Sequence, residues 1–236
     1  MKKQLDKYQI WLKQINNEAL NLNYTQLVWD KLTTIQNNSK HFKKTGGHLQ
    51  KWIHNNYICH LIMLISRICD PSGTQKSDRN LSKFLKEIRD NHYITFERFL
   101  NAHNPLPPHE QELKFIEING IKMKESCLTY EEVENDYLEI TKISKSDDFC
   151  DGMIEEDLNE IKYISESIKK LRDKRIAHLT NTKIEKVPTY KSVNENVENL
   201  LNIIRKYNLL IFNVHETFDY CDLNIHTVFE KPWIEH

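Results

Sequence analysis

The sequence predicts an all-α helical bundle. The chain of 236 residues contains only five glycines and six prolines. The glycine content is about a third of the average, and helices tolerate such a scarcity of turn residues. Apolar residues also recur every three or four positions, which is the helical period. The chain is 39% hydrophobic and 28% charged and is long enough to bury a core. We therefore expect a single domain over 1–236, with a core bundle at about 49–215.

The N-terminal half is expected to hold helices separated by clusters of glycine and proline. Helices over 4–38 carry two apolar stripes, the first ending at Leu22 and the second beginning at Leu27. A helix from Leu49 to Cys69 is apolar on most of its surface, which predicts a central position. It should end before Asp70-Pro71, because proline disfavours helical geometry at the preceding residue. A further helix is expected from about Asn80 to the prolines at 105–108.

The middle of the chain allows two interpretations. Residues 114–124 alternate apolar and polar around Asn119-Gly120, which is the signal for a two-residue β-hairpin turn. The same apolar residues also fit one side of a helix. After this segment, Thr129 and Glu132 form a capping box that predicts a short helix over Tyr130 to Ile143.

The C-terminal half contains the most regular pattern. A narrow apolar seam predicts one long helix, and its members are Ile154, Leu158, Ile161, Ile164, Ile168 and Leu171. Acidic residues lie at its start and basic residues at its end, as the helix dipole favours. A polar loop to about Tyr190 leads to a last long helix, and we expect the two helices to pack antiparallel. The tail at 221–236 has no period and should either strap the bundle or fray.

Composition excludes several classes of function. The formal net charge is −1, so any nucleic-acid contact must be local. The five cysteines form no CxxC pair, and no apolar stretch is long enough for a signal peptide or a membrane span. These features predict a cytoplasmic protein with no membrane contact. Phosphate-binding glycine loops and common hydrolase motifs are absent. The histidines at positions 41, 48, 54 and 60 lack the spacing of a helical metal pair, so we expect no metal and no cofactor.

One constellation remains, at the end of the seam helix, in the segment LRDKRIAHLTN at 171–181. Arg172 is followed by Asp173, and five residues separate Arg172 from His178. This spacing resembles the motif of the HEPN superfamily, in which four to six residues separate an arginine from a histidine. The sequence of this segment resembles the abortive-infection U branch of that superfamily. A second stretch, from Ile65 to Ile88 around Asp70-Pro71, resembles the same branch.

The resemblance implies a homodimer that cleaves RNA without a metal, with a role in phage defence or as a toxin. The ends of the motif helices would meet across a twofold axis, so that both copies of Arg172 and His178 line one cleft. His178 would move protons, and Arg172 would bind the scissile phosphate. Asp173 would orient His178 or an arginine. Other supporting or RNA-binding candidates are Lys169, Lys170, Lys174, Arg175 and Asn181.

Alternatives stay open at this point. Arg98 and His103 satisfy the same spacing, and the basic residues around Arg172 are also what a helix C-terminus selects. The chain could instead be a non-catalytic HEPN-like module that binds RNA or protein, or the partner of an antitoxin or a nucleotidyltransferase. Thr180 stands where some toxins of this superfamily carry a modified tyrosine, so that mode of neutralisation is not expected.

Overall fold

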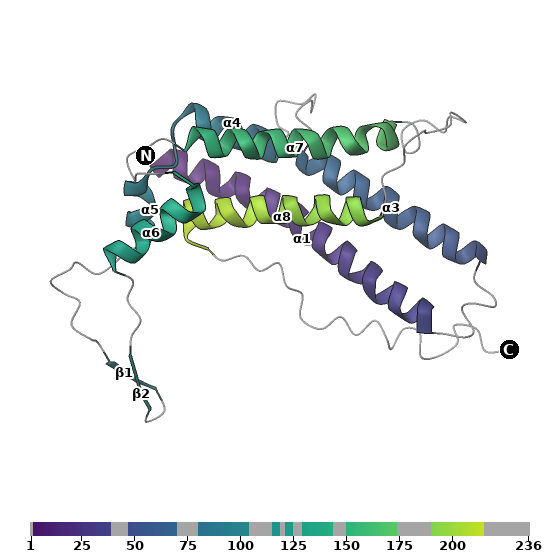
Figure 1. The fold of residues 1–236 in the computed structure, drawn as a ribbon, viewed down its shortest axis with the longest axis horizontal. Helices are drawn as coiled ribbons and strands as arrows, with labels where there is room; N and C mark the ends of the chain where they lie inside the picture. The colour runs from purple at the N-terminus through teal and green to yellow at the C-terminus, as the bar shows by residue number, and fades with distance from the viewer. Residues whose placement is uncertain are drawn as a thin grey trace. The chain divides into compact units, whose positions relative to one another are not determined.

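The computed structural model describes residues 2–38, 47–69, 80–103, 115–118, 121–124, 129–143, 150–173 and 190–214. The tail at 221–236 therefore lies outside the described residues. The elements, shown in Figure 1, are α1 (Lys2–Asn38), α3 (Gly47–Cys69), α4 (Leu81–Asp90), α5 (Phe96–His103), β1 (Phe115–Ile118), β2 (Ile121–Lys124), α6 (Tyr130–Thr141), α7 (Asp151–Leu171) and α8 (Tyr190–Phe212).

The predicted all-α class is confirmed, and so is the hairpin. Strands β1 and β2 pair antiparallel, with Ile118 opposite Ile121. The helical interpretation of this segment is therefore wrong. Across the part of the chain that the structure describes, no helix has the length and apolar character needed to cross a membrane.

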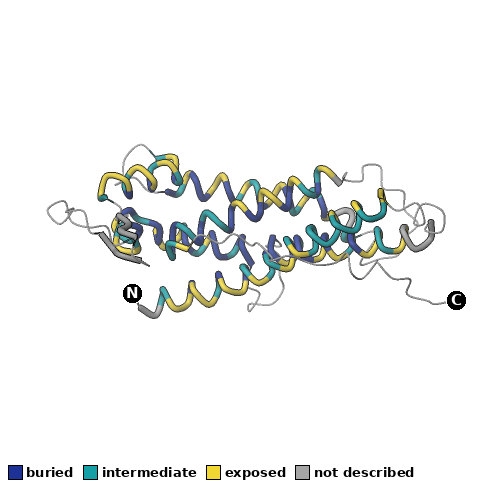
Figure 2. The backbone as a smooth tube through the Cα atoms, turned by 90° about the horizontal axis from the view of Figure 1, so that it is seen from below, coloured by how far each residue is buried: buried dark blue, intermediate teal, exposed yellow. Residues whose placement is uncertain are grey.

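The chain divides into two compact units. Unit 1 comprises residues 1–84, 160–204 and 217–236, and unit 2 comprises residues 85–159 and 205–216. Helices α4, α7 and α8 contribute residues to both units. Figure 2 shows buried residues alternating with exposed ones along each helix, as expected for amphipathic helices.

The N-terminal segment is one continuous helix, where the two apolar stripes predicted more than one. No glycine or proline occurs between residues 2 and 38, so nothing ends the helix where its stripe changes position. The first stripe belongs to the core of unit 1, because its members are at most 2% exposed: Tyr8, Leu12, Ile15, Ala19 and Leu22. This part of α1 is therefore integral to the unit.

Helix α3 is buried over only part of its length, which corrects the expectation of a fully central helix. Its core residues begin at Tyr57 and continue to Cys69, whereas Trp52 is 65% exposed. The helix ends at Cys69 as predicted. The Ser82 hydroxyl donates to the Cys69 carbonyl at 2.9 Å, and Asn80 caps α4 by accepting from the Lys83 amide at 2.9 Å.

Two helices, α4 and α5, replace the single helix expected from Asn80 to the prolines. The break is a Schellman motif. The Tyr93 amide donates to the Ile88 carbonyl and the His92 amide to the Arg89 carbonyl, both at 2.9 Å. His92 takes the left-handed position with φ of 43°. Because histidine stands where glycine is usual, the sequence carries no breaker signal here.

The remaining helices follow the sequence pattern closely. Helix α6 has the predicted capping box between Thr129 and Glu132. Helices α7 and α8 pack antiparallel, as expected. In unit 1 the Asn199 amide donates to Glu160 at 2.8 Å, and the Asn196 amide donates to the Ser167 hydroxyl at 3.1 Å. The later residue of α7 thus contacts the earlier residue of α8, as it must in an antiparallel pair.

Candidate functional site

The predicted site begins where α7 ends. The helix stops at Leu171, and residues 172–173 continue in a wider, π-helical turn. The Arg172 Nε–H donates to Asp173 Oδ1 at 2.9 Å. The Arg172 side chain is 27% exposed and that of Asp173 is 45% exposed. This hydrogen bond holds the Nε edge of the guanidinium against Asp173. Because the guanidinium is planar, the bond also restricts the orientation of its plane.

The helix pair beneath Arg172 gives it a rigid base. In unit 1, Ile161, Ile164 and Ile168 of α7 are at most 1% exposed. Ser167 closes a short chain of hydrogen bonds, because it receives the Asn196 amide and donates to the Ile164 carbonyl at 2.7 Å. The last buried turn of α7 thus fixes the position of the residues that follow it.

The structure brings together only part of the predicted set. Arg172 and Asp173 are in contact, and Lys169 is exposed one turn earlier on α7. His178, Lys174, Arg175 and Asn181 lie outside the described residues, as does the side chain of Lys170. Asp173 therefore contacts an arginine, and its other expected partner, His178, lies outside the described residues.

The second Arg-His pair is occupied by contacts within its own segment. The Arg98 guanidinium donates to the Tyr93 carbonyl at 2.7 Å and lies 4.1 Å from the centre of the Tyr93 ring. His103 Nδ1 lies 2.9 Å from the Phe99 carbonyl oxygen. These contacts stabilise both ends of α5.

A buried ionic cluster in unit 2 was not predicted as a site. Asp157 accepts hydrogen bonds from Lys206 Nζ at 2.7 Å and from the Tyr207 hydroxyl at 2.7 Å. Burial, together with the negative charge of Asp157, raises the pKa of Tyr207 well above its usual value. Asp157 follows Ile154 by three residues and precedes Ile161 by four, so its place on the seam face was a signal that could have identified it.

A second buried contact in unit 2 joins Tyr137 to Cys150. The hydroxyl and the thiol are 3.1 Å apart, and Cys150 is 2% exposed. Burial raises the pKa of the Cys150 thiol and, together with the thiol contact, that of the Tyr137 hydroxyl. Cysteine nucleophiles need a lowered pKa, so Cys150 has the properties of a structural thiol.

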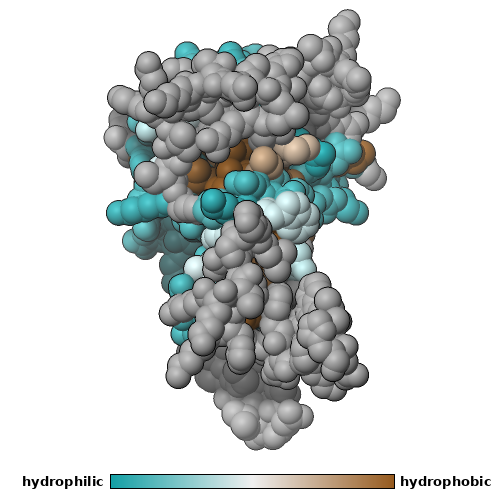
Figure 3. Space-filling view, turned by 90° about the vertical axis from the view of Figure 1, so that its right-hand side faces the viewer, coloured by the Kyte–Doolittle hydropathy of each residue, from teal (hydrophilic) through white to brown (hydrophobic). Residues whose placement is uncertain are grey.

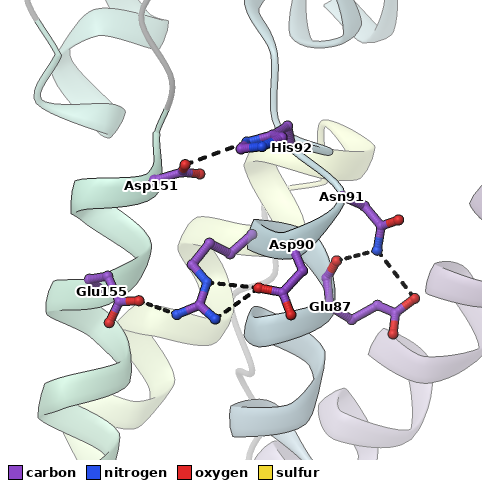
Figure 4. A network of polar contacts seen from close by, with 7 residues as sticks. Glu87, Asp90, Asn91, His92, Asp151 and Glu155 are labelled. Carbon is purple, nitrogen blue, oxygen red and sulfur yellow. Dashed lines mark hydrogen bonds and ion pairs between the residues drawn. The ribbon is translucent and has the colours of Figure 1, made fainter.

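Exposed ion pairs join α4 to the start of α7 in unit 2 (Figure 4). Arg89 bridges Asp90 and Glu155, and His92 Nδ1 lies 3.4 Å from Asp151 Oδ2. The two carboxylates raise the pKa of Arg89 through these hydrogen bonds. Because these groups are paired across helix ends, the cluster stabilises a junction and offers no reactive group. Within the described residues, no three histidine, cysteine, aspartate or glutamate side chains gather as metal ligands would.

Charge is divided unevenly between the two units. By sequence, unit 1 contains 23 Lys and Arg against 15 Asp and Glu, a net charge of +8. Unit 2 contains 10 against 19, a net charge of −9, and the two account for the −1 of the whole chain. The near-neutral total therefore conceals a basic unit, and Arg172 belongs to it.

The fold and this helix end define the chain as a helical protein with an anchored arginine in a basic unit. No model of a known protein family matches the chain, and no curated protein or solved structure matches it either. The likeness to HEPN proteins thus rests on the residues quoted above.

Proposed function

We propose that the protein is a HEPN-type, metal-independent endoribonuclease that works as a cytoplasmic homodimer with a toxin-like role in phage defence. Arg172 and His178 are its working pair. The observation that carries the proposal is the anchoring of Arg172 by Asp173 at the end of α7, within the unit of net charge +8. RNA is a polyanion, so a basic unit around a fixed guanidinium suits it.

The chemistry follows from the groups available. His178 accepts the proton of a ribose 2′-hydroxyl, whose oxygen attacks the adjacent phosphorus. The bond from phosphorus to the 5′-oxygen breaks, and the leaving oxygen takes a proton from solvent water, so that one Arg172 and one His178 suffice for the step. The products are a 2′,3′-cyclic phosphate and a 5′-hydroxyl. Arg172 neutralises the charge that develops on the phosphoryl oxygens, and its bond to Asp173 limits its motion.

A second copy of the chain is part of the proposal because the resemblance to HEPN proteins implies a composite site. On a continuous helix, six residues would place His178 about 120° around the axis from Arg172. Helix α7 ends at Leu171, so the second copy rests on the resemblance and not on helix geometry alone. Two copies related by a twofold axis can supply both groups to one cleft.

The test is cleavage of total RNA in the presence of a chelator. We expect wild-type protein to produce fragments with 2′,3′-cyclic phosphate ends and the H178A variant to lose at least a hundredfold in rate. The H103A variant is the matched control, because His103 belongs to the other Arg-His pair, and it should cleave like wild type. RNA binding without cleavage that depends on His178 would identify a non-catalytic binding module instead.

A further inference from the structure

Two helix segments of unit 1 form an arm whose described side chains are not buried. The arm consists of residues 23–38 of α1 and residues 47–56 of α3. No residue of α1 beyond Leu22 is buried, and none of the described side chains of α3 before Tyr57 is buried. Figure 2 shows this change from buried to partly exposed residues along the helices.

Aromatic contacts hold the α1 segment of the arm against α3. The rings of Trp29 and Tyr57, the buried residue that directly follows the arm in α3, are stacked, with centroids 4.3 Å apart and planes 9° apart. His54 meets Trp29 edge-on at 5.5 Å. The apolar side chains of Leu27, Leu32 and Ile35 still remain partly exposed. A helix keeps an apolar stripe of this kind when another surface packs on it.

The composition of the arm is that of a protein interface. Asp30, Lys31 and Lys51 are its only charged residues among 26, whereas 28% of the whole chain is charged. Its exposed residues include several asparagines and two large aromatic side chains, Trp52 at 65% exposure and Tyr24 at 39%. Protein interfaces are depleted in charge and enriched in aromatic residues, whereas a surface for RNA needs cations.

The position of the arm relates it to the predicted site. Within unit 1, the end at which α1 finishes and α3 begins is also the end at which α7 finishes and α8 begins (Figure 1). Arg172 therefore lies at the end from which the arm extends. Seen from this end, hydrophobic residues reach the surface among hydrophilic ones (Figure 3).

We propose that the arm is the dimer interface and that its occupant is the arm of a second copy of this chain. Unit 1 carries a net charge of +8, so unit 1 of one copy repels unit 1 of another except where charge is sparse. The arm, with a net charge of +1, is such a place. Sixteen residues of α1 extend about 24 Å, and a helix pair is about 20 Å wide. Pairing two arms thus buries on the order of 1,000 Å² in total, about the minimum area of a biological interface.

The functional significance of this interface rests on the proposed function, because the paired arms would bring the two helix ends that carry Arg172 near one twofold axis. Its test is independent of RNA. We expect the full chain at micromolar concentration to sediment as a dimer. The W52E variant, with its change on an exposed residue, should weaken dimerisation at least tenfold, because it places a charge on each face of the interface. The Y163E variant is the control, since Tyr163 is 64% exposed on α7 and lies outside the arm.

Two outcomes would overturn the inference: a monomeric wild type, or W52E protein that dimerises like wild type. A monomer whose affinity for single-stranded RNA falls in W52E would identify RNA as the occupant of the arm. The proposed function fails separately. A dimer that depends on the arm but cleaves no RNA would refute the ribonuclease alone, and a monomer that cleaves RNA through His178 would refute the interface alone.

Discussion

Individual side chains explain why some polar groups in this chain are structural and others are available for chemistry. Asp157, Lys206 and Tyr207 satisfy one another inside unit 2, and Tyr137 pairs with Cys150. Arg172 differs because Asp173, one of its partners, is the next residue in the chain and has a side chain that is 45% exposed. A contact of that kind orients a guanidinium near solvent, where a phosphate can reach it.

Removing the charge of Asp157 should destabilise the protein. In the D157N variant the Lys206 ammonium, whose side chain is only 23% exposed, loses its carboxylate partner. We expect a loss of about 2 kcal/mol in the free energy of unfolding, less than for a fully buried pair because Lys206 retains some solvent. Urea denaturation measures it. The E156Q variant, with its change on the exposed neighbouring residue, should differ from wild type by less than about 0.5 kcal/mol.

Three buried acids should make the protein sensitive to high pH. The pKa values of Cys150, Tyr137 and Tyr207 are all raised by burial. Above about pH 9 the unfolded chain loses these protons while the folded chain keeps them. The folded state then binds more protons, so the free energy of unfolding falls as the pH rises. Denaturation between pH 8 and pH 11 should show this fall, and it should be shallower in Y137F.

At the scale of elements, helix ends determine where the chain turns. Left-handed residues terminate three helices, and none of them is glycine: His92, Lys142 and Asn213. Such residues give little signal in a sequence, which explains why the break between α4 and α5 was missed. The ends marked by Asp70-Pro71 and by the capping box of Thr129 and Glu132 were predicted correctly, because those residue types act locally.

The left-handed residue at the end of α6 allows the free energy of unfolding to be raised or lowered by single substitutions in that helix. Lys142 is exposed with φ of 55° and ψ of 28°, a conformation that glycine adopts without steric cost. K142G should therefore raise the free energy of unfolding by about 1 kcal/mol. E139G, on the exposed side of the last turn of α6, should lower it by up to about 1 kcal/mol. Equal signs for the two variants in thermal denaturation would contradict this account of the helix end.

Sequence patterns predicted elements better than they predicted contacts. The seam of α7 and the period of α8 were visible, because each depends on residues close in the chain. The partner of Asp157 lies about fifty residues away, and no local pattern identifies it. The incomplete burial of α1 was also invisible, because a helical stripe shows which face is apolar but not whether anything covers it.

At the scale of the molecule, the partition of charge matters more than its total. A net charge of −1 gave no indication of nucleic-acid binding, yet unit 1 and unit 2 carry net charges of +8 and −9. The predicted arginine and the arm both belong to the basic unit. Under the proposed function, the basic unit would bind the polyanion, and the sparsely charged arm would bind the second copy.

Exposed lysines of the two units should differ in their effect on RNA affinity. K169E reverses a charge one turn before Arg172, in unit 1, and should weaken RNA binding on the order of fivefold at low salt. K86E makes the same change on an exposed residue of unit 2 and should leave the affinity close to that of wild type. Filter binding at several salt concentrations measures both. Equal losses in the two variants would contradict a role for the charge partition.

The central claim is that Arg172 of one copy and His178 of another act on the same RNA linkage. The most direct measurement mixes the R172A and H178A proteins after reversible dissociation and follows cleavage of a defined RNA. Each variant alone should be inactive, and the mixture should regain about a quarter of the wild-type rate, because half of the dimers are mixed and each holds one complete pair. A mixture as inactive as its components would contradict a site shared between two copies.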